Sequence, residues 1–249
     1  MQSKLILGTA NFGKPYGIKG DPVPSLREIE KITQVAWDGG IRKIYTYEAY
    51  GCDDSIMGIF KDFSVIQKKG VLPDWFQEGS KIGLSVYETK EIEDEMRVYS
   101  YSYDIYQFPI NVLDTRFLKY LKYLKERKLE IHARSVFLQG LLLMDELPSW
   151  VKGEARTMVN TFQIVCKSEG WEYYEAALGW VLGLKDIDHV IVGVNSAEQL
   201  QQLLDVKPLQ WKYDFSIQDE NALNPRRWPT EKKIPDIEFL RKHNAINYG

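Results

Sequence analysis

The chain has little cysteine and no long apolar run, and each of these absences excludes a class of protein. Its two cysteines, Cys52 and Cys166, lie far apart and have no CxxC spacing, so the sequence predicts neither a disulfide framework nor a thiolate metal site. No run of roughly 18 apolar residues occurs, and the first residues lack the pattern of a secretory signal. We therefore expect a cytoplasmic protein that does not enter a membrane.

An excess of positive charge is also missing. The 249 residues include 32 basic and 35 acidic side chains, which gives a formal net charge of -3, and the two signs are interspersed. Binding to a phosphate backbone needs a basic face, so nucleic acid is not an expected partner. Hydrophobic residues make up 44% of the chain, a content typical of a globular protein with a sizeable core.

Apolar segments of strand length alternate with amphipathic segments along the chain. This alternation predicts βαβ units and a mainly parallel sheet, that is, an α/β protein. Seven segments are predicted as strands: Lys4–Thr9, Arg42–Tyr47, Phe63–Lys68, Lys81–Val86, Asp104–Phe108, Glu130–Ser135 and His189–Val194.

Two capping sequences mark where helices begin. Ser25 and Glu28 have the S-x-x-E spacing of a capping box, and the helix they open is expected to end at the glycines 39–40. A second capping box at 196–199 directly follows the last predicted strand. No linker divides the chain, so we expect one domain, with a barrel over residues 1–206 and a packed extension over residues 207–249.

The segments at the predicted strand ends form a recognisable series. They read LGTANFG (7–13), AYG (49–51), KIGLSVY (81–87), QFPINVLD (107–114), IHARSVFLQG (131–140) and VIVGV (190–194). In this order they resemble the aldo-keto reductase superfamily, above all the branch often found beside bacterial polysaccharide genes. The resemblance implies a TIM-barrel-like parallel (β/α) barrel and an NAD(P)H-dependent oxidoreductase that reduces a small or sugar-derived carbonyl compound.

The resemblance also assigns catalytic roles. It implies that Tyr50 donates a proton to the carbonyl oxygen and that Lys68 lowers the pKa of its phenol. The position of the family's aspartate is occupied by Tyr45, which cannot form a carboxylate–lysine ion pair. Tyr45, Tyr50 and Lys68 are therefore the expected catalytic residues of an incomplete set.

The strand that carries the family's histidine has no counterpart here. Only residues 69–80 separate the third predicted strand from the fourth, too few for a further strand and its helices, because a single parallel crossover takes a dozen or so residues. We therefore expect about seven strands, with one strand and its flanking helix lost. His132, His189 and His243 are not where a replacement is expected, and each is interpreted as an ordinary hydrogen-bonded histidine.

The cofactor is expected at the carboxyl ends of the strands, where ligands of such barrels bind. The resemblance implies a set of cofactor-binding residues: Ser85 and Gln107 for the nicotinamide carboxamide, Arg134 and Ser135 under the ring or its phosphate, and Gly193, Asn195, Ser196 and Gln199 at the phosphate-binding helix. Arg134 occupies the position of the family's ring-stacking aromatic, and basic residues for a 2′-phosphate are missing. The expected cofactor is NADP or NAD without a preference for NADP, and no metal is expected.

Three functions stay open at this point. The first is the divergent oxidoreductase, and the second is an isomerase or lyase on a sugar-type metabolite that uses tyrosine, glutamate and lysine side chains at residues 45–68 without nicotinamide. The third is a catalytically inactive binding module on the same barrel. A lost strand leaves open sheet edges, so a homodimer across the gap near Trp75 and Phe76 is also expected.

Overall fold

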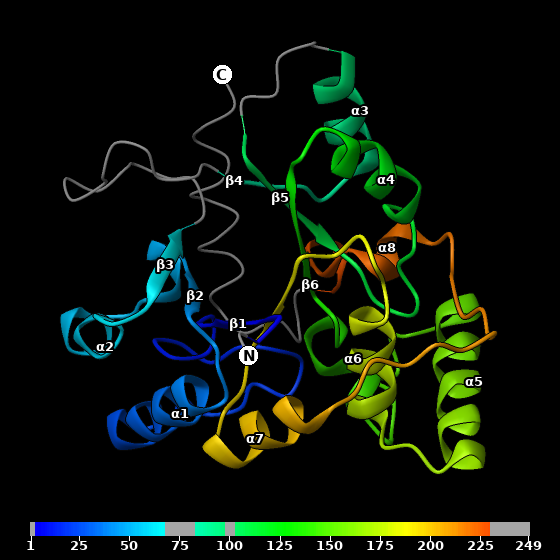
Figure 1. The fold of residues 1–249 in the computed structure, drawn as a ribbon. Coiled ribbons are helices and arrows are strands. Elements are labelled where there is room, and N and C mark those ends of the chain that lie inside the picture. The colour runs from blue at the N-terminus through cyan, green and yellow to red at the C-terminus, as the bar shows by residue number, and fades with distance from the viewer. Residues whose placement is uncertain (1–2, 68–82, 98–102, 230–249) are drawn as a thin grey trace.

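The structure is a computed structural model that describes residues 3–67, 83–97 and 103–229 (Figure 1). Its seven strands are parallel and form one sheet in the order β3-β2-β1-β7-β6-β5-β4. The strands are β1 Leu5–Gly8, β2 Lys43–Thr46, β3 Ser64–Gln67, β4 Gly83–Ser85, β5 Ile105–Pro109, β6 Glu130–Arg134 and β7 His189–Val192. All seven predicted strands are confirmed, each with bounds that differ by one or two residues at most.

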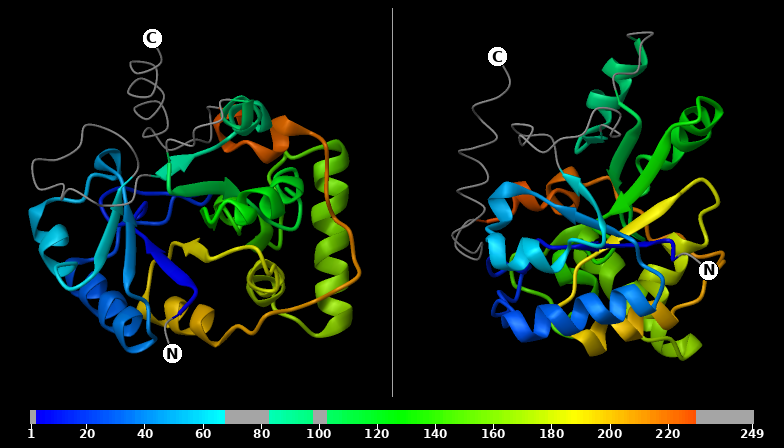
Figure 2. Two further views of the ribbon diagram at one scale, coloured as in Figure 1. Left: turned by 45° about the horizontal axis from the view of Figure 1, so that its top comes forward. Right: turned by 60° about the vertical axis from the view of Figure 1, so that its left-hand side comes forward.

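The sheet curls as an incomplete barrel, with the helices on its outer side (Figure 2). β1 pairs with both β2 and β7, as in a closed barrel. Within the described residues no pairing joins β3 to β4, so these two strands are the ends of the sheet. In the described ranges the sheet thus has its break between the third and fourth strands, where the sequence predicts that a strand is lost.

The helices alternate with the strands along the chain. They are α1 Leu26–Asp38, α2 Asp54–Ile59, α3 Thr89–Arg97, α4 Leu118–Glu126, α5 Gly153–Glu169, α6 Tyr173–Leu182, α7 Ala197–Asp205 and α8 Glu220–Leu223, with short 3-10 helices η1 Glu48–Tyr50, η2 Leu138–Leu143 and η3 Pro225–Arg227. Helix α1 buries Ile29, Ile32 and Ala36, residues three and four positions apart that lie on one helical face. Hydrophobic burial of this face holds the helix against the sheet.

Helix α1 begins and ends where the sequence predicts, but Glu28 does not complete the capping box. Ser25 Oγ accepts a hydrogen bond from Glu28 N at 3.2 Å, and Gly39 is the C-cap. The Glu28 carboxylate instead accepts a hydrogen bond from Ala197 N, the first residue of α7, at 2.9 Å. A tertiary contact has thus replaced the local one.

The core consists of two clusters of buried apolar side chains. The first lies between the outer face of the sheet and the helices and includes Leu7, Ile44 and Val190. The second includes Phe162 of α5 and Trp228 of the C-terminal segment. Each fully buried side chain of this size contributes roughly 1.5–3 kcal/mol, which fixes residues 207–229 on the same body. The division of the chain at residue 206 stays a prediction.

The strand register decides which side chains face the concave side. Residues that pair in a parallel sheet point to the same side, and successive residues point to opposite sides. Because Ile44 packs in the outer core, the side chain of the neighbouring Tyr45 faces the concave side, where its register partner Gly8 has no side chain. Ser85 pairs with Gln107, and Gln107 pairs with His132.

Candidate active site

Four tyrosines and one arginine gather at the carboxyl end of the strands. Tyr45 belongs to β2, Tyr50 ends η1, Tyr16 lies after β1, Tyr87 lies after β4, and Arg134 is the last residue of β6. Tyr16, Tyr45, Tyr87 and Arg134 all act electrostatically on the Tyr50 phenol. We call this group the tyrosine–arginine cluster. It brings together two of the three predicted catalytic residues, and the third, Lys68, lies outside the described residues.

Close contact between two loops positions Tyr50. A Cβ atom at Gly13 would lie 2.2 Å from the carbonyl carbon of Gly51 and 2.4 Å from Tyr50 O, so only glycine fits at residue 13. Gly51 has φ +74°, in the left-handed region that glycine adopts without strain. The Tyr50 ring lies edge-on to Tyr47, with a centroid distance of 5.7 Å. These contacts hold the phenol beside the ends of β1 and β2.

Burial dominates the protonation of the cluster. Burial raises the pKa of Tyr50 well above its usual value, the neighbouring phenols add to the shift, and Arg134 opposes it. Burial also raises the pKa of Tyr45, again opposed by Arg134. Both phenols are therefore protonated at neutral pH, and a phenolate can form only where a cation stabilises it. Among the described residues, Arg134 is a cation that acts on both.

Two buried polar atoms beside the cluster, Gln107 Oε1 and Arg134 Nε, have no hydrogen-bond partner within the described part of the chain. The Ser85 hydroxyl, also buried, lies close enough to Tyr45 to lower the pKa of its phenol. Ser85 and Gln107 are register neighbours on β4 and β5, so their side chains lie next to each other on the concave side. A buried polar group without a partner costs about 1–3 kcal/mol, and a polar ligand at this place would remove that cost.

Arg134 is held by neutral groups and stacks on an aromatic ring. Its Nη2 donates to Val86 O at 2.7 Å, and its Nη1 donates to Ser135 Oγ at 3.2 Å. Its guanidinium carbon lies 4.0 Å from the centroid of Tyr87. Ser135 has φ +58°, a strained conformation for a residue with a side chain. Arg134 therefore adjoins Tyr87 at the carboxyl end of β6, and Ser135 bonds Arg134 there.

The four residues predicted at the phosphate-binding helix lie at or just before the start of α7, and three of them bond to one another. Ser196 Oγ accepts from Gln199 N at 3.2 Å, and Gln199 Oε1 accepts from Asn195 N at 2.7 Å. Gly193 precedes them, and a Cβ there would lie 3.4 Å from Asn11 Oδ1. The amides at this helix end are therefore already partly satisfied by side chains of the protein.

Two carboxylates lie at the same helix end. The Glu28 carboxylate accepts from Ala197 N, and the hydrogen bond lowers the pKa of Glu28. The Asp21 carboxylate accepts from Asn195 Nδ2 at 2.9 Å. A helix N-terminus favours negative charge, and here Glu28 supplies that charge from within the protein.

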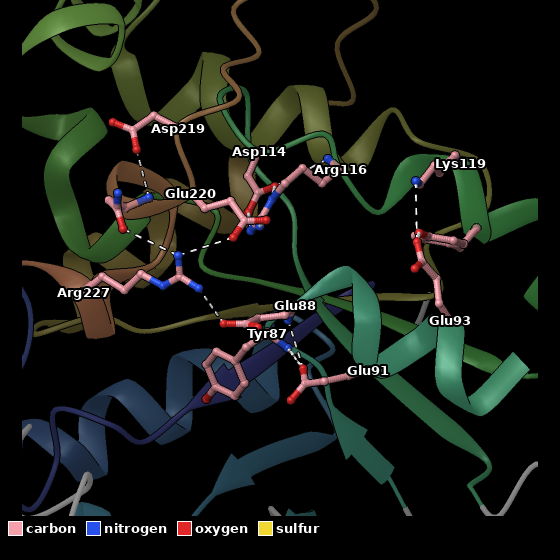
Figure 3. A network of polar contacts seen from close by, with 12 residues as sticks. Tyr87, Glu88, Glu91, Glu93, Asp114, Arg116, Lys119, Asp219, Glu220 and Arg227 are labelled. Carbon is pink, nitrogen blue, oxygen red and sulfur yellow. Dashed lines mark hydrogen bonds and ion pairs between the residues drawn. The ribbon is translucent and has the colours of Figure 1, made fainter.

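The C-terminal segment is tied to the beginning of α3 (Figure 3). Arg227 Nη2 bonds Glu88 Oε1 at 2.7 Å, and Arg227 Nη1 lies 3.4 Å from Glu220 Oε2. The adjacent Arg226 places its guanidinium carbon 3.4 Å from the centroid of Tyr87. Residues 219–227 thus reach the tyrosine–arginine cluster although they are remote from it in sequence.

A second polar group lies at the opposite, amino end of the strands. Lys43 Nζ lies 2.6 Å from Glu130 Oε1 and 2.9 Å from His189 Nε2, and His132 Nε2 lies 2.8 Å from Glu130 Oε1. The ligand atoms of Glu130, His132 and His189 lie within 4.8 Å of one another, a spacing that could hold a metal ion. The Lys43 ammonium already bonds two of them. Both histidines are hydrogen-bonded, as predicted, and His243 lies outside the described residues.

Sequence reasoning did not single out four residues that shape the site, namely Tyr16, Tyr87, Glu28 as an anion at α7, and Arg226. Tyr87 could have been found, because it follows Ser85 by two residues at the end of a predicted strand and strand ends carry the ligand sites of barrels. Arg226 had no such signal, since its position depends on how the C-terminal segment folds back.

Comparisons with known proteins agree with this architecture. A family model described as the aldo/keto reductase family matches residues 76–217. The matched segment includes Ser85, Gln107 and Arg134 but begins after Tyr50. The aldo-keto reductase AKR11C1 from Bacillus halodurans, in its holo form, matches with a TM-score of 0.58 and 13% identity over 84% of this chain and 89% of that one. At this identity the likeness concerns the fold alone.

Two further comparisons are negative. A search of curated protein sequences finds no match. No helix in the described ranges is both long enough and apolar enough to cross a membrane.

Proposed function

This chain belongs to the aldo/keto reductase family, and from that premise we propose that it is an NAD(P)H-dependent oxidoreductase. Its substrate is a small or sugar-derived carbonyl compound, in keeping with the resemblance to the branch found beside polysaccharide genes. Tyr50 is the proton donor, and Lys68 is the partner that lowers the pKa of its phenol. The free thiols of Cys52 and Cys166 suit an enzyme of the reducing cytoplasm.

The pair Ser85 and Gln107 is the observation that carries this proposal. A carboxamide has an N–H donor and a carbonyl acceptor. The unpartnered Gln107 Oε1 can accept from its N–H, and the Ser85 hydroxyl, which also acts on the Tyr45 phenol, can donate to its carbonyl. The two side chains are register neighbours, so one planar amide can reach both. Nicotinamide, when bound, supplies the hydride for the carbonyl carbon. Ser85 and Gln107 would orient its ring toward the tyrosine–arginine cluster.

The proton comes from the protein. Tyr50 donates its phenolic proton to the carbonyl oxygen, and the phenolate that remains is stabilised by Lys68 and by the guanidinium of Arg134, which opposes the upward pKa shift of Tyr50. Tyr45 places a neutral phenol where the family has a carboxylate. That phenol does not offset the positive charge available to Tyr50.

The start of α7 favours NAD over NADP. The carboxylates of Glu28 and Asp21 lie at this helix end, where a 2′-phosphate would meet like charge. Asn195, Ser196 and Gln199 can still bond the uncharged ribose hydroxyls of NAD through their side chains. We therefore propose that NADH is the working cofactor.

Titration of the purified protein with NADH and NADPH, followed by nucleotide fluorescence, tests the proposal. NADH is expected to bind more tightly than NADPH, and Glu28→Gln is expected to narrow the difference. Ser85→Ala combined with Gln107→Ala should weaken binding of both. Absence of any response at millimolar concentrations of either nucleotide would contradict the assignment, and nicotinamide-free turnover of a sugar-type metabolite would favour an isomerase or lyase.

The role of Tyr50 is tested by Tyr50→Phe. This variant should retain NADH binding and lose turnover by about a hundredfold or more, since general acid catalysis contributes about that much. Tyr213→Phe is the matched control, because that phenol bonds Glu169 Oε1 at 2.5 Å on the surface, away from the cluster. Equal loss in both variants, or unchanged turnover in Tyr50→Phe, would contradict the role of Tyr50.

We also propose that two copies associate across the open edges of the sheet. In the described residues β3 and β4 are the two ends of the sheet, and unpaired strand edges favour association. Trp75 and Phe76, the residues predicted near this contact, lie outside the described residues.

A further inference from the structure

We infer that the carbonyl substrate carries an anionic group, a carboxylate or a phosphate, which Arg134 and Arg226 bind beside Tyr87. The inference rests on the proposed function, because it specifies the substrate class of that same site. This anion position lies next to the phenols of the tyrosine–arginine cluster, where Tyr50 is proposed to donate its proton to the carbonyl oxygen. One small molecule could therefore place its anionic group at the arginines and its carbonyl group at Tyr50.

Arg134 is a cation whose hydrogen-bond partners are all neutral. Its Nη1 and Nη2 donate to Ser135 Oγ and Val86 O, and its Nε is buried without a partner. Among the described residues no carboxylate bonds to it. A half-buried guanidinium without a counter-ion is costly, because the protein has removed part of its hydration without supplying an opposite charge. An anion that accepts from Nε would supply the missing bond and the missing charge.

Arg226 adds a second positive charge at the same place. The guanidinium carbons of Arg134 and Arg226 lie 4.0 Å and 3.4 Å from the centroid of one ring, Tyr87, so they cannot be farther apart than these two distances together. Two guanidinium groups on one aromatic ring make this place strongly positive, which favours the binding of an anion. Their planar N–H groups suit the oxygens of a carboxylate or a phosphate.

The position of Arg226 favours the substrate over the cofactor as the source of the anion. Arg226 enters with η3, which Arg227 ties to Glu88 at the beginning of α3 (Figure 3). The ribose of the cofactor is expected at the start of α7, which follows β7. The sheet order places β6 and β5 between β7 and β4, so this end of the cofactor and the proposed anion position lie beyond different strands. Arg134 of β6 adjoins Tyr87 and acts on the phenols of Tyr45 and Tyr50.

A matched pair of probes tests the inference without depending on turnover. We would measure binding of 4-carboxybenzaldehyde and of its methyl ester by calorimetry, first in the absence of nucleotide. A charge-assisted bond to an arginine corresponds to about ten- to a hundredfold in affinity, so the acid should bind about that much more tightly than the ester. Arg134→Gln should abolish the preference, and Arg226→Gln should reduce it. Arg97→Gln is the control and should retain it, because Arg97 pairs with Asp94 on the exposed surface of α3.

The outcomes separate this inference from the proposed function. If the protein prefers the acid in a way that depends on Arg134 but does not bind NADH, the result would support the anion site and contradict the reductase assignment. Equal affinity for acid and ester in the wild type would overturn the inference. A drop in NADH affinity in Arg134→Gln with an unchanged acid preference would assign Arg134 to a cofactor phosphate and also overturn it. If Arg134→Gln does not fold, Arg134→Lys, which keeps the positive charge, and Arg226→Gln are measured in its place. Both are judged by the preference for the acid over the ester and by the affinity for NADH.

Discussion

Arg116→Ala is expected to be among the most destabilising surface-proximal substitutions in this protein. Arg116 Nε and Nη2 bond the two oxygens of Asp114 at 2.8 Å and 2.9 Å, and Arg116 Nη1 lies 3.3 Å from Glu220 Oε1 (Figure 3). The Asp114 side chain is 0% exposed and that of Arg116 is 10% exposed. Removing the guanidinium leaves a fully buried carboxylate without its counter-ion.

The magnitude follows from the burial of the pair. Breaking a buried ion pair by removing one partner costs about 3–5 kcal/mol, and in a chain of this length each kcal/mol lowers Tm by about 2–4 °C. Arg116→Ala should therefore lower Tm by about 6–20 °C. The double variant Asp114→Asn with Arg116→Met should be closer to the wild type, because it leaves no unpaired buried charge.

The assay is urea unfolding followed by tryptophan fluorescence, with Tm from circular dichroism. Arg97→Ala is the control, because Arg97 pairs with Asp94 at 3.3 Å with side chains that are 76% and 52% exposed, and an exposed pair contributes about 0–1 kcal/mol. The reasoning is refuted if Arg116→Ala loses less than about 1 kcal/mol, or if the double variant is as unstable as the single one.

Two other predictions concern the amino-end group and the sheet edges. Burial lowers the pKa of His189 to about 4, and Lys43 and His132 add to this shift. In unfolded chains the pKa of histidine is about 6.5, so between these two values the unfolded state binds more protons than the folded state. Stability should therefore fall as pH drops from about 6.5 to about 4. After allowance for partial exposure of His189, the loss of folding free energy is about 1–2 kcal/mol. His189→Gln should flatten the dependence of stability on pH. An unchanged dependence in that variant would show that His189 is not the titrating group. Light scattering should give twice the mass of one chain, and substitution of Trp75 and Phe76 by aspartate should lower it; a wild-type monomer at all concentrations would contradict association across the open edges.

Local pattern was enough to predict most of the architecture. The seven strands and the start of α1 depend on apolar runs and on the Ser25 cap, which act over a few residues, and the structure has them within one or two residues of the predicted bounds. Helix α5 was not predicted although Ala155, Val159, Phe162 and Cys166 are buried at helical spacing. Its N-cap, Lys152, makes no side-chain capping bond, so the usual start signal was missing.

The candidate site could be predicted only in part. The spacing of the strands and the resemblance pointed to Ser85, Gln107, Tyr45, Tyr50 and Arg134 as residues at the carboxyl end of the sheet. Neither could show that Gln107 Oε1 and Arg134 Nε lack partners among the described residues, because hydrogen bonding depends on every neighbour in space. The predicted roles of these side chains stay predictions until the nucleotide and anion titrations are done.

The sequence by itself determined that this is a parallel α/β chain, and it predicted about seven strands with a break between the third and fourth, because strand length, alternation and the short separation at 69–80 are local properties. Only the tertiary structure decided that Arg134 and Arg226 share the ring of Tyr87 and that Glu28 bonds the first amide of α7. These contacts join residues far apart in the chain, and the free energy that selects them comes from packing and charge in the folded state.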